Sequence, residues 1–106
     1  MKSRIIVSGV IATALSLGGG QSALAAAVNS PDGGARASNV GLQLTIKDTK
    51  ADGHSVYTNY NPGGGRLENF NGNGTSLSVN LGSLTSFRAC TNIGGGPDSC
   101  SSYVSP

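Results

Sequence analysis

Residues 40–47, with the sequence VGLQLTIK, decide the fold class of this chain, because aliphatic residues alternate along them with polar or small ones. A period of two places successive side chains on opposite faces of an extended strand. One face is then wholly aliphatic and carries Val40, Leu42, Leu44 and Ile46. The segment therefore predicts a half-buried β-strand.

The same alternation continues toward the C-terminus, where loops rich in Gly, Pro and Asn separate short segments. These segments predict further strands at residues 54–60, 66–70, 77–81, 84–91 and 99–104. The loop before His54 ends in Asp52-Gly53, a pair suited to a tight return, so strands 40–47 and 54–60 are expected to form an antiparallel hairpin. We expect Tyr60, Phe70 and Phe87 to fill the core.

Six short strands with Gly and Pro turns predict an all-β fold, a small antiparallel β-sandwich or barrel. Residues 26–38 carry small, polar and turn-forming types without hydrophobic periodicity, and we expect them to form a flexible leader. The predicted organisation is a signal peptide at 1–25, a flexible leader at 26–38 and a secreted β domain at 39–106.

The N-terminus has the three parts of a secretory signal peptide. Lys2 and Arg4 precede an apolar run at residues 5–17, and Ala23-Leu24-Ala25 forms a small-x-small cleavage site. We predict cleavage after Ala25, with cleavage after Ala27 as the alternative. The apolar run is shorter than the roughly 20 residues that a membrane-spanning helix needs, so we expect an extracellular protein without a membrane span.

The formal net charge of +2 is accounted for by Lys2 and Arg4, so the chain beyond Ala25 is neutral. A neutral domain lacks the excess of basic residues that nucleic acids and anionic membranes attract, and we expect neither partner.

Cys90 and Cys100 are the two cysteines of the chain and lie ten positions apart. In an oxidising compartment, such a pair predicts one local disulfide. The alternative is two free thiols or half of a metal site, and no second Cys or His pair exists to complete four metal ligands.

The sequence predicts no catalytic residues and no cofactor. His54 lies close to Asp52 and Ser55, but a catalytic triad needs the base in line with both partners, whereas neighbours on a strand point to opposite faces. Nucleophile-elbow, P-loop and dinucleotide-binding motifs are missing from the sequence.

Two segments partly match calcium-binding loops. Residues 48–53 (DTKADG) begin like an EF-hand loop but carry Lys50 at a ligand position and Asn59 at the twelfth, so we treat this match as chance. Residues 71–76 (NGNGTS), preceded by Phe70, partly resemble the calcium-binding stretch of crystallin-type β proteins. This second resemblance implies a crystallin-like calcium-binding domain, although a Gly-rich turn explains the residues more simply.

A broader resemblance covers residues 40–104. The segments 47–57 (KDTKADGHSVY), 72–76 (GNGTS), 88–91 (RACT) and 97–102 (PDSCSS) resemble those of small secreted two-cysteine β proteins of unknown function from actinomycetes such as Streptomyces. The resemblance implies a secreted location and a structural role for the cysteines, and it implies no activity.

The leading hypothesis is a secreted, non-enzymatic domain that binds a cell-surface polymer or an extracellular protein. Tyr57, on the polar face of its predicted strand, is the candidate ring for stacking on a sugar. The alternative is a small effector, a protease inhibitor or an antimicrobial toxin, that acts through Ile93 in the disulfide-closed loop 91–99. The calcium-binding domain is a third hypothesis.

Overall fold

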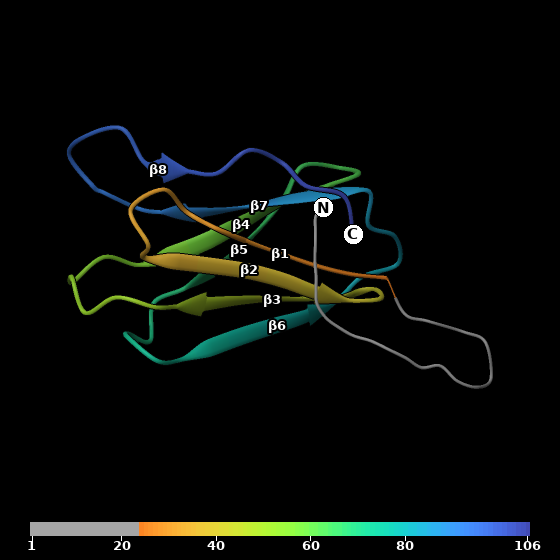
Figure 1. The fold of residues 1–106 in the computed structure, drawn as a ribbon, viewed down its shortest axis with the longest axis horizontal. Helices are drawn as coiled ribbons and strands as arrows, with labels where there is room; N and C mark the ends of the chain where they lie inside the picture. The colour runs from red at the N-terminus through yellow and green to blue at the C-terminus, as the bar shows by residue number, and fades with distance from the viewer. Residues whose placement is uncertain (1–23) are drawn as a thin grey trace.

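The computed structural model describes residues 24–106, which form two antiparallel four-stranded sheets packed face to face (Figure 1). Sheet A has the strand order β1-β2-β3-β6, and sheet B has the order β5-β4-β7-β8. The strands are β1 (Ala25–Asn29), β2 (Ala35–Val40), β3 (Gln43–Asp48), β4 (Val56–Asn61), β5 (Gly65–Asn69), β6 (Ser76–Asn80), β7 (Ser86–Thr91) and β8 (Ser99–Cys100). The predicted all-β sandwich is confirmed, with eight strands instead of six.

The predicted signal peptide lies outside the described residues, apart from its last two positions. Within residues 24–106 the structure contains no long apolar helix that could cross a bilayer.

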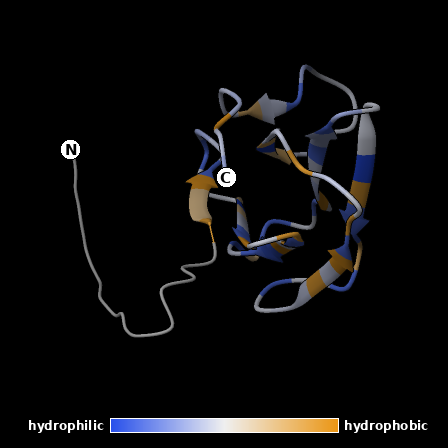
Figure 2. Cartoon of the chain, turned by 90° about the vertical axis from the view of Figure 1, so that its right-hand side faces the viewer, coloured by the Kyte–Doolittle hydropathy of each residue, from blue (hydrophilic) through white to orange (hydrophobic). Residues whose placement is uncertain are grey.

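The core lies between the two sheets, and hydrophobic and hydrophilic residues alternate along the strands that enclose it (Figure 2). β3 contributes Leu44 and Ile46, both fully buried, as the period-two pattern predicts. Val40 and Leu42 are exposed instead. The reason is a reversal at Gly41, whose φ of +59° turns the chain between β2 and β3, so Val40 belongs to a different strand from Leu44.

The predicted hairpin between residues 40–47 and 54–60 is wrong. β3 pairs with β2 and β6, whereas β4 pairs with β5 and β7 in the opposite sheet. The connection from Thr49 to Ser55 therefore crosses from one sheet to the other. Each sheet needs apolar residues on its inner face. β3 provides such residues to sheet A, and β4 provides them to sheet B.

In place of the expected flexible leader at 26–38, the structure has strands β1 and β2. Ala35 and Ala37 of β2 are fully buried between the sheets, where small side chains fit the narrow space. Polar bonds stabilise the β1–β2 turn, because Asp32 accepts hydrogen bonds from Ser30 of the turn and from Thr91 of β7. The sequence prediction missed these strands because side-chain hydrogen bonds to a distant strand produce no hydrophobic pattern in the sequence.

The three aromatic residues expected in the core have different environments. Phe87 of β7 is fully buried, and Tyr60 of β4 lies opposite it and packs against the core while half-buried. Phe70 is 75% exposed, because β5 ends at Asn69 and the chain turns away before the ring could enter the core.

Candidate functional site

The predicted disulfide is present and joins Cys90 of β7 to Cys100 of β8. The two cysteines are directly opposite each other in the register of the two strands. The disulfide anchors the short strand β8 to the sheet, and hydrogen bonds between Ser101 and Ala89 and the bridge between Phe87 and Val104 continue the connection to β7. This end of the chain is thus held along the β7 edge of sheet B.

The outer face of sheet B carries charged, amide and aromatic side chains from β4, β5 and β7. Alternation along β4, β5 and β7 directs Val56, Leu67 and Phe87 into the core and the intervening residues outward. One row across the three strands reads Arg66, Asn59, Arg88, and the next reads Glu68, Tyr57, Cys90. We call these two rows, with Tyr103 and Asp98 beside them, the sheet B face.

Tyr57 lies on this face, but its ring is not accessible to a ligand. Only 4% of the residue is exposed, because the guanidinium of Arg66 lies 3.5 Å from the ring centroid. Its hydroxyl donates a hydrogen bond to Asp98 Oδ2. Burial, together with this bond to a carboxylate, raises the pKa of Tyr57 above its ordinary value. Tyr57 therefore supports Arg66 and does not offer the free ring that the sequence suggested.

Arg66 is neutralised by a carboxylate on its own strand. Its Nη2 lies 2.7 Å from Glu68 Oε1, and Glu68 Oε2 accepts hydrogen bonds from Ser55 Oγ and Asn92 Nδ2. Burial acts to raise the pKa of Glu68, but the bonds from Ser55, Asn92 and Arg66 outweigh it, so the pKa lies below its ordinary value. Glu68 is thereby held as a carboxylate that orients Arg66.

Arg88 has a different environment. Its Nε donates to Asn59 Oδ1 at 3.0 Å, and its guanidinium carbon lies 5.0 Å from the centroid of the Tyr103 ring. Among residues 24–106, neither terminal amino group of Arg88 has a hydrogen-bond acceptor, and no carboxylate pairs with it. Tyr103 is 46% exposed. The sheet B face therefore presents a guanidinium with free donors beside an accessible aromatic ring.

In the sequence, alternation along residues 84–91 places Arg88 and Cys90 on the strand face opposite Phe87. Tyr103 is one of the three tyrosines, with Tyr57 and Tyr60, that the composition offers for a sugar site. Tyr103 lies beyond β8 in a segment without regular pairing, and its approach to Arg88 depends on the disulfide and on the bridge at Val104.

The predicted effector loop follows β7 and is clamped at its base. Asp98 Oδ1 accepts the backbone N–H of Ile93 at 3.0 Å, while its other oxygen accepts the Tyr57 hydroxyl. The bond from Tyr57, followed by the bond from Ile93, lowers the pKa of Asp98. Ile93 itself is half-buried, and residues 94–98 are exposed.

The residues of a triad type, Asp52, His54 and Ser55, make separate contacts. Asp52 Oδ1 accepts the backbone N–H of His54, and Ser55 Oγ donates to Glu68. Within residues 24–106 there is no group of three or more His, Cys, Asp or Glu side chains arranged to hold a metal ion.

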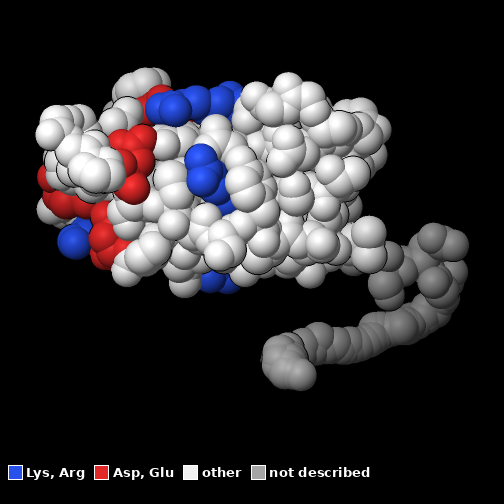
Figure 3. Space-filling model, turned by 90° about the horizontal axis from the view of Figure 1, so that it is seen from above, with Lys and Arg blue, Asp and Glu red and all other residues white. Residues whose placement is uncertain are grey.

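Charged side chains are unevenly distributed over the sandwich. Seen from above, acidic side chains gather toward one end together with one basic group, the other basic side chains lie nearer the middle, and the opposite end of this view shows neither (Figure 3).

Comparison with known proteins finds no matching family model, curated protein or solved structure.

Proposed function

We propose that this protein is a secreted, non-enzymatic binding module, and that its sheet B face holds an extracellular polymer bearing sugar rings and anionic groups. The observation that carries the proposal is the free guanidinium edge of Arg88 beside the exposed ring of Tyr103. Guanidinium groups bind carboxylates and phosphates through paired N–H donors. A tyrosine ring provides a flat apolar surface with a polar tip, which suits sugars.

The arrangement around Arg88 supports binding because it is rigid before any ligand arrives. Asn59 fixes the Nε edge of Arg88, and the disulfide fixes the segment that carries Tyr103. Arg66, in the same row two strands away, is already paired with Glu68, so Arg88 is the arginine of this face whose terminal donors are open to an anionic group. Preorganised side chains lose little entropy on binding.

The test is binding of the purified protein to polygalacturonate, which carries carboxylates, compared with cellulose, a neutral polymer. We expect binding to polygalacturonate that weakens with salt, because exposed charges are screened. Arg88→Gln and Tyr103→Ala should each weaken binding about tenfold or more, since each removes a contact at the centre of the face.

Arg36→Gln is the matched control, because it removes the same charge from β2 in sheet A, where Arg36 is exposed and its side chain, among residues 24–106, bonds only to Asn29. The proposal fails if Arg36→Gln weakens binding as much as Arg88→Gln, or if no anionic polymer binds.

The clamped loop 91–99 supports a second candidate, the secreted inhibitor or toxin. Asp98 holds the loop at Ile93 and at Tyr57, which reduces the entropy that the loop would lose in the cleft of a target. Inhibition of an extracellular protease that disappears with Ile93→Ala, but persists with Arg88→Gln, would favour this function over polymer binding.

A further inference from the structure

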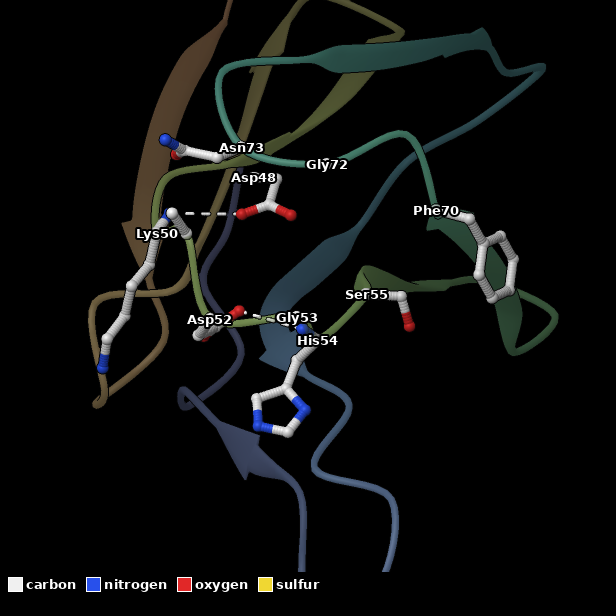
Figure 4. Close-up of a pocket in the computed structure, with 10 residues that line it drawn as sticks. Asp48, Lys50, Asp52, Gly53, His54, Ser55, Phe70, Gly72 and Asn73 are labelled. Carbon is white, nitrogen blue, oxygen red and sulfur yellow. Dashed lines mark hydrogen bonds between the residues drawn. The ribbon is translucent and has the colours of Figure 1, made fainter.

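A pocket with a volume of about 350 Å³ lies at one end of the sandwich, away from the Arg88 side of the sheet B face. The β3–β4 connection and the β5–β6 turn form its walls, and the close-up shows side chains from both segments around it (Figure 4). The two segments are held together by backbone bonds from Gly74 N to Asp48 O and from Asp48 N to Thr75 O. The pocket therefore joins the two loops that partly matched calcium-binding sequences.

Asp48 is the buried acid of this pocket. Only 2% of the residue is exposed, although it lines the pocket wall. Its Oδ1 accepts the backbone N–H of Lys50 at 3.1 Å. Within residues 24–106, its Oδ2 receives no hydrogen bond, and no basic side chain forms an ion pair with it. Figure 4 shows the carboxylate directed into the space between the two segments.

The base nearest in sequence does not compensate this charge. Lys50 extends away from Asp48, and its Nζ lies 3.4 Å from the backbone oxygen of Asp32. A second carboxylate, Asp52, also lines the pocket and bonds through Oδ1 to the backbone of its own loop. A buried carboxylate without a cationic partner is unfavourable, so the pocket favours a positively charged occupant.

The size and the lining of the pocket favour an organic cation over a bare metal ion as its occupant. A volume near 350 Å³ lies at the lower end of the range for small-molecule sites, and it exceeds what a single ion fills. Within residues 24–106 no cluster of three acidic, His or Cys side chains is placed to hold a metal. The exposed ring of Phe70 lies at the rim and provides apolar surface.

We propose that this pocket binds a small ligand carrying a primary ammonium group. Asp48 Oδ2 is the principal acceptor for the ammonium group, and the Asp52 carboxylate in the same pocket adds negative charge. The apolar part of the ligand lies toward Phe70. The proposal is independent of the polymer site, which uses other residues.

The experiment titrates the full chain, labelled with ¹⁵N, with benzylamine at neutral pH and follows its backbone amide signals by NMR. Benzyl alcohol, a neutral probe of similar shape, and calcium chloride are titrated separately. We expect saturable shifts with benzylamine that are confined to residues 48–55 and 70–74, and much weaker shifts with benzyl alcohol.

Asp48→Asn keeps the size of the side chain and the acceptor for Lys50 but removes the charge. It should weaken benzylamine binding by about tenfold or more, the range expected for a lost charge-assisted hydrogen bond. Arg36→Gln is the control, because it removes one charge from the exposed surface of β2, outside the pocket, and should leave benzylamine binding unchanged. Asp52→Asn, in an exposed loop, provides a second test if Asp48→Asn fails to fold.

Equal binding of benzyl alcohol and benzylamine would overturn the proposal, as would unchanged binding in Asp48→Asn and Asp52→Asn. Shifts with calcium but not with benzylamine would assign the pocket to a metal and also overturn it.

Discussion

Asp32 Oδ1 accepts a hydrogen bond from Thr91 Oγ1 at 2.9 Å, which connects the β1–β2 turn to β7 in the opposite sheet. The same oxygen accepts bonds from Ser30 Oγ and the backbone N–H of Gly34. A cluster of polar bonds thus closes one end of the sandwich where hydrophobic contacts are few. It also explains why residues 26–38, poor in large apolar side chains, are ordered.

We predict opposite effects for two threonine-to-valine substitutions in the core. Thr91 and Thr58 are both fully buried, but Thr91 bonds to Asp32, whereas Thr58 Oγ1 has no partner among the described residues. Thr91→Val should lower the free energy of unfolding by about 1 to 3 kcal/mol, because it removes a bond to a charged group. Thr58→Val should leave it unchanged or raise it, because the lost hydroxyl was buried without a bond. Urea unfolding measures both, and equal losses would contradict the assignment of these bonds.

We predict that the two phenylalanines differ sharply in their contribution to stability. Phe87→Ala should lower the free energy of unfolding by about 3 to 5 kcal/mol, because it leaves a cavity between the sheets. Phe70→Ala should change it by no more than about 0.5 kcal/mol, because the ring is exposed. Thermal unfolding followed by circular dichroism compares the variants, and a large loss in Phe70→Ala would show that this ring packs against the domain.

Stability should fall in acid. Hydrogen bonds outweigh burial to lower the pKa of Glu68 and of Asp32 below their ordinary values of 4.5 and 3.8. A carboxyl group whose pKa is lowered by folding stabilises the folded state at pH values above its ordinary pKa. This stabilisation is lost as the pH falls through the pKa of the folded state. The melting temperature should therefore decrease progressively below about pH 4.5.

Glu68→Gln tests the contribution of one group to this acid profile. Its melting temperature should be lower at pH 7 and should fall less steeply between pH 5 and pH 2 than that of the parent. Parallel profiles for the two proteins would show that Glu68 does not contribute.

The predicted cleavage after Ala25 would place the new N-terminus within β1. Ala26 N donates to Asn39 Oδ1 at 2.8 Å, and Ala26 and Val28 pack against the core. We predict that mass spectrometry of the secreted protein finds Ala26 as its first residue. A chain starting at Val28 loses the Ala26 contacts and should be less stable to urea by about 1 to 2 kcal/mol. Equal stability of the two chains would mean that the start of β1 contributes little.

Local pattern was sufficient to predict part of this structure. The alternation in residues 40–47 and 54–60 predicted strands, and Leu44, Ile46 and Val56 of their inner faces are buried, although Val40 and Leu42 are exposed. The two cysteines predicted the disulfide because the chain offers no other pairing. These features depend on side-chain period and residue type, which a sequence displays directly.

Strand pairing depended on tertiary structure. The hairpin expected between residues 40–47 and 54–60 does not form, because a polar loop is equally compatible with a tight return and with a crossing to the second sheet. Ala35 and Ala37 became core residues only because the sheets lie close together there.

The candidate sites show the same division. Sequence placed Tyr57 on a polar face, which is correct, but its burial beneath Arg66 and its bond to Asp98 result from strands that pack together after folding. The sequence also could not predict the free guanidinium of Arg88 or the unpaired oxygen of Asp48 among residues 24–106. Both depend on which donors and acceptors the folded chain places beside them. The sequence by itself determined the all-β class, the strand-forming segments from residue 43 onward and the disulfide, but not the strands β1 and β2. The tertiary structure alone decided which polar groups are paired, because their partners come from residues far apart in the chain.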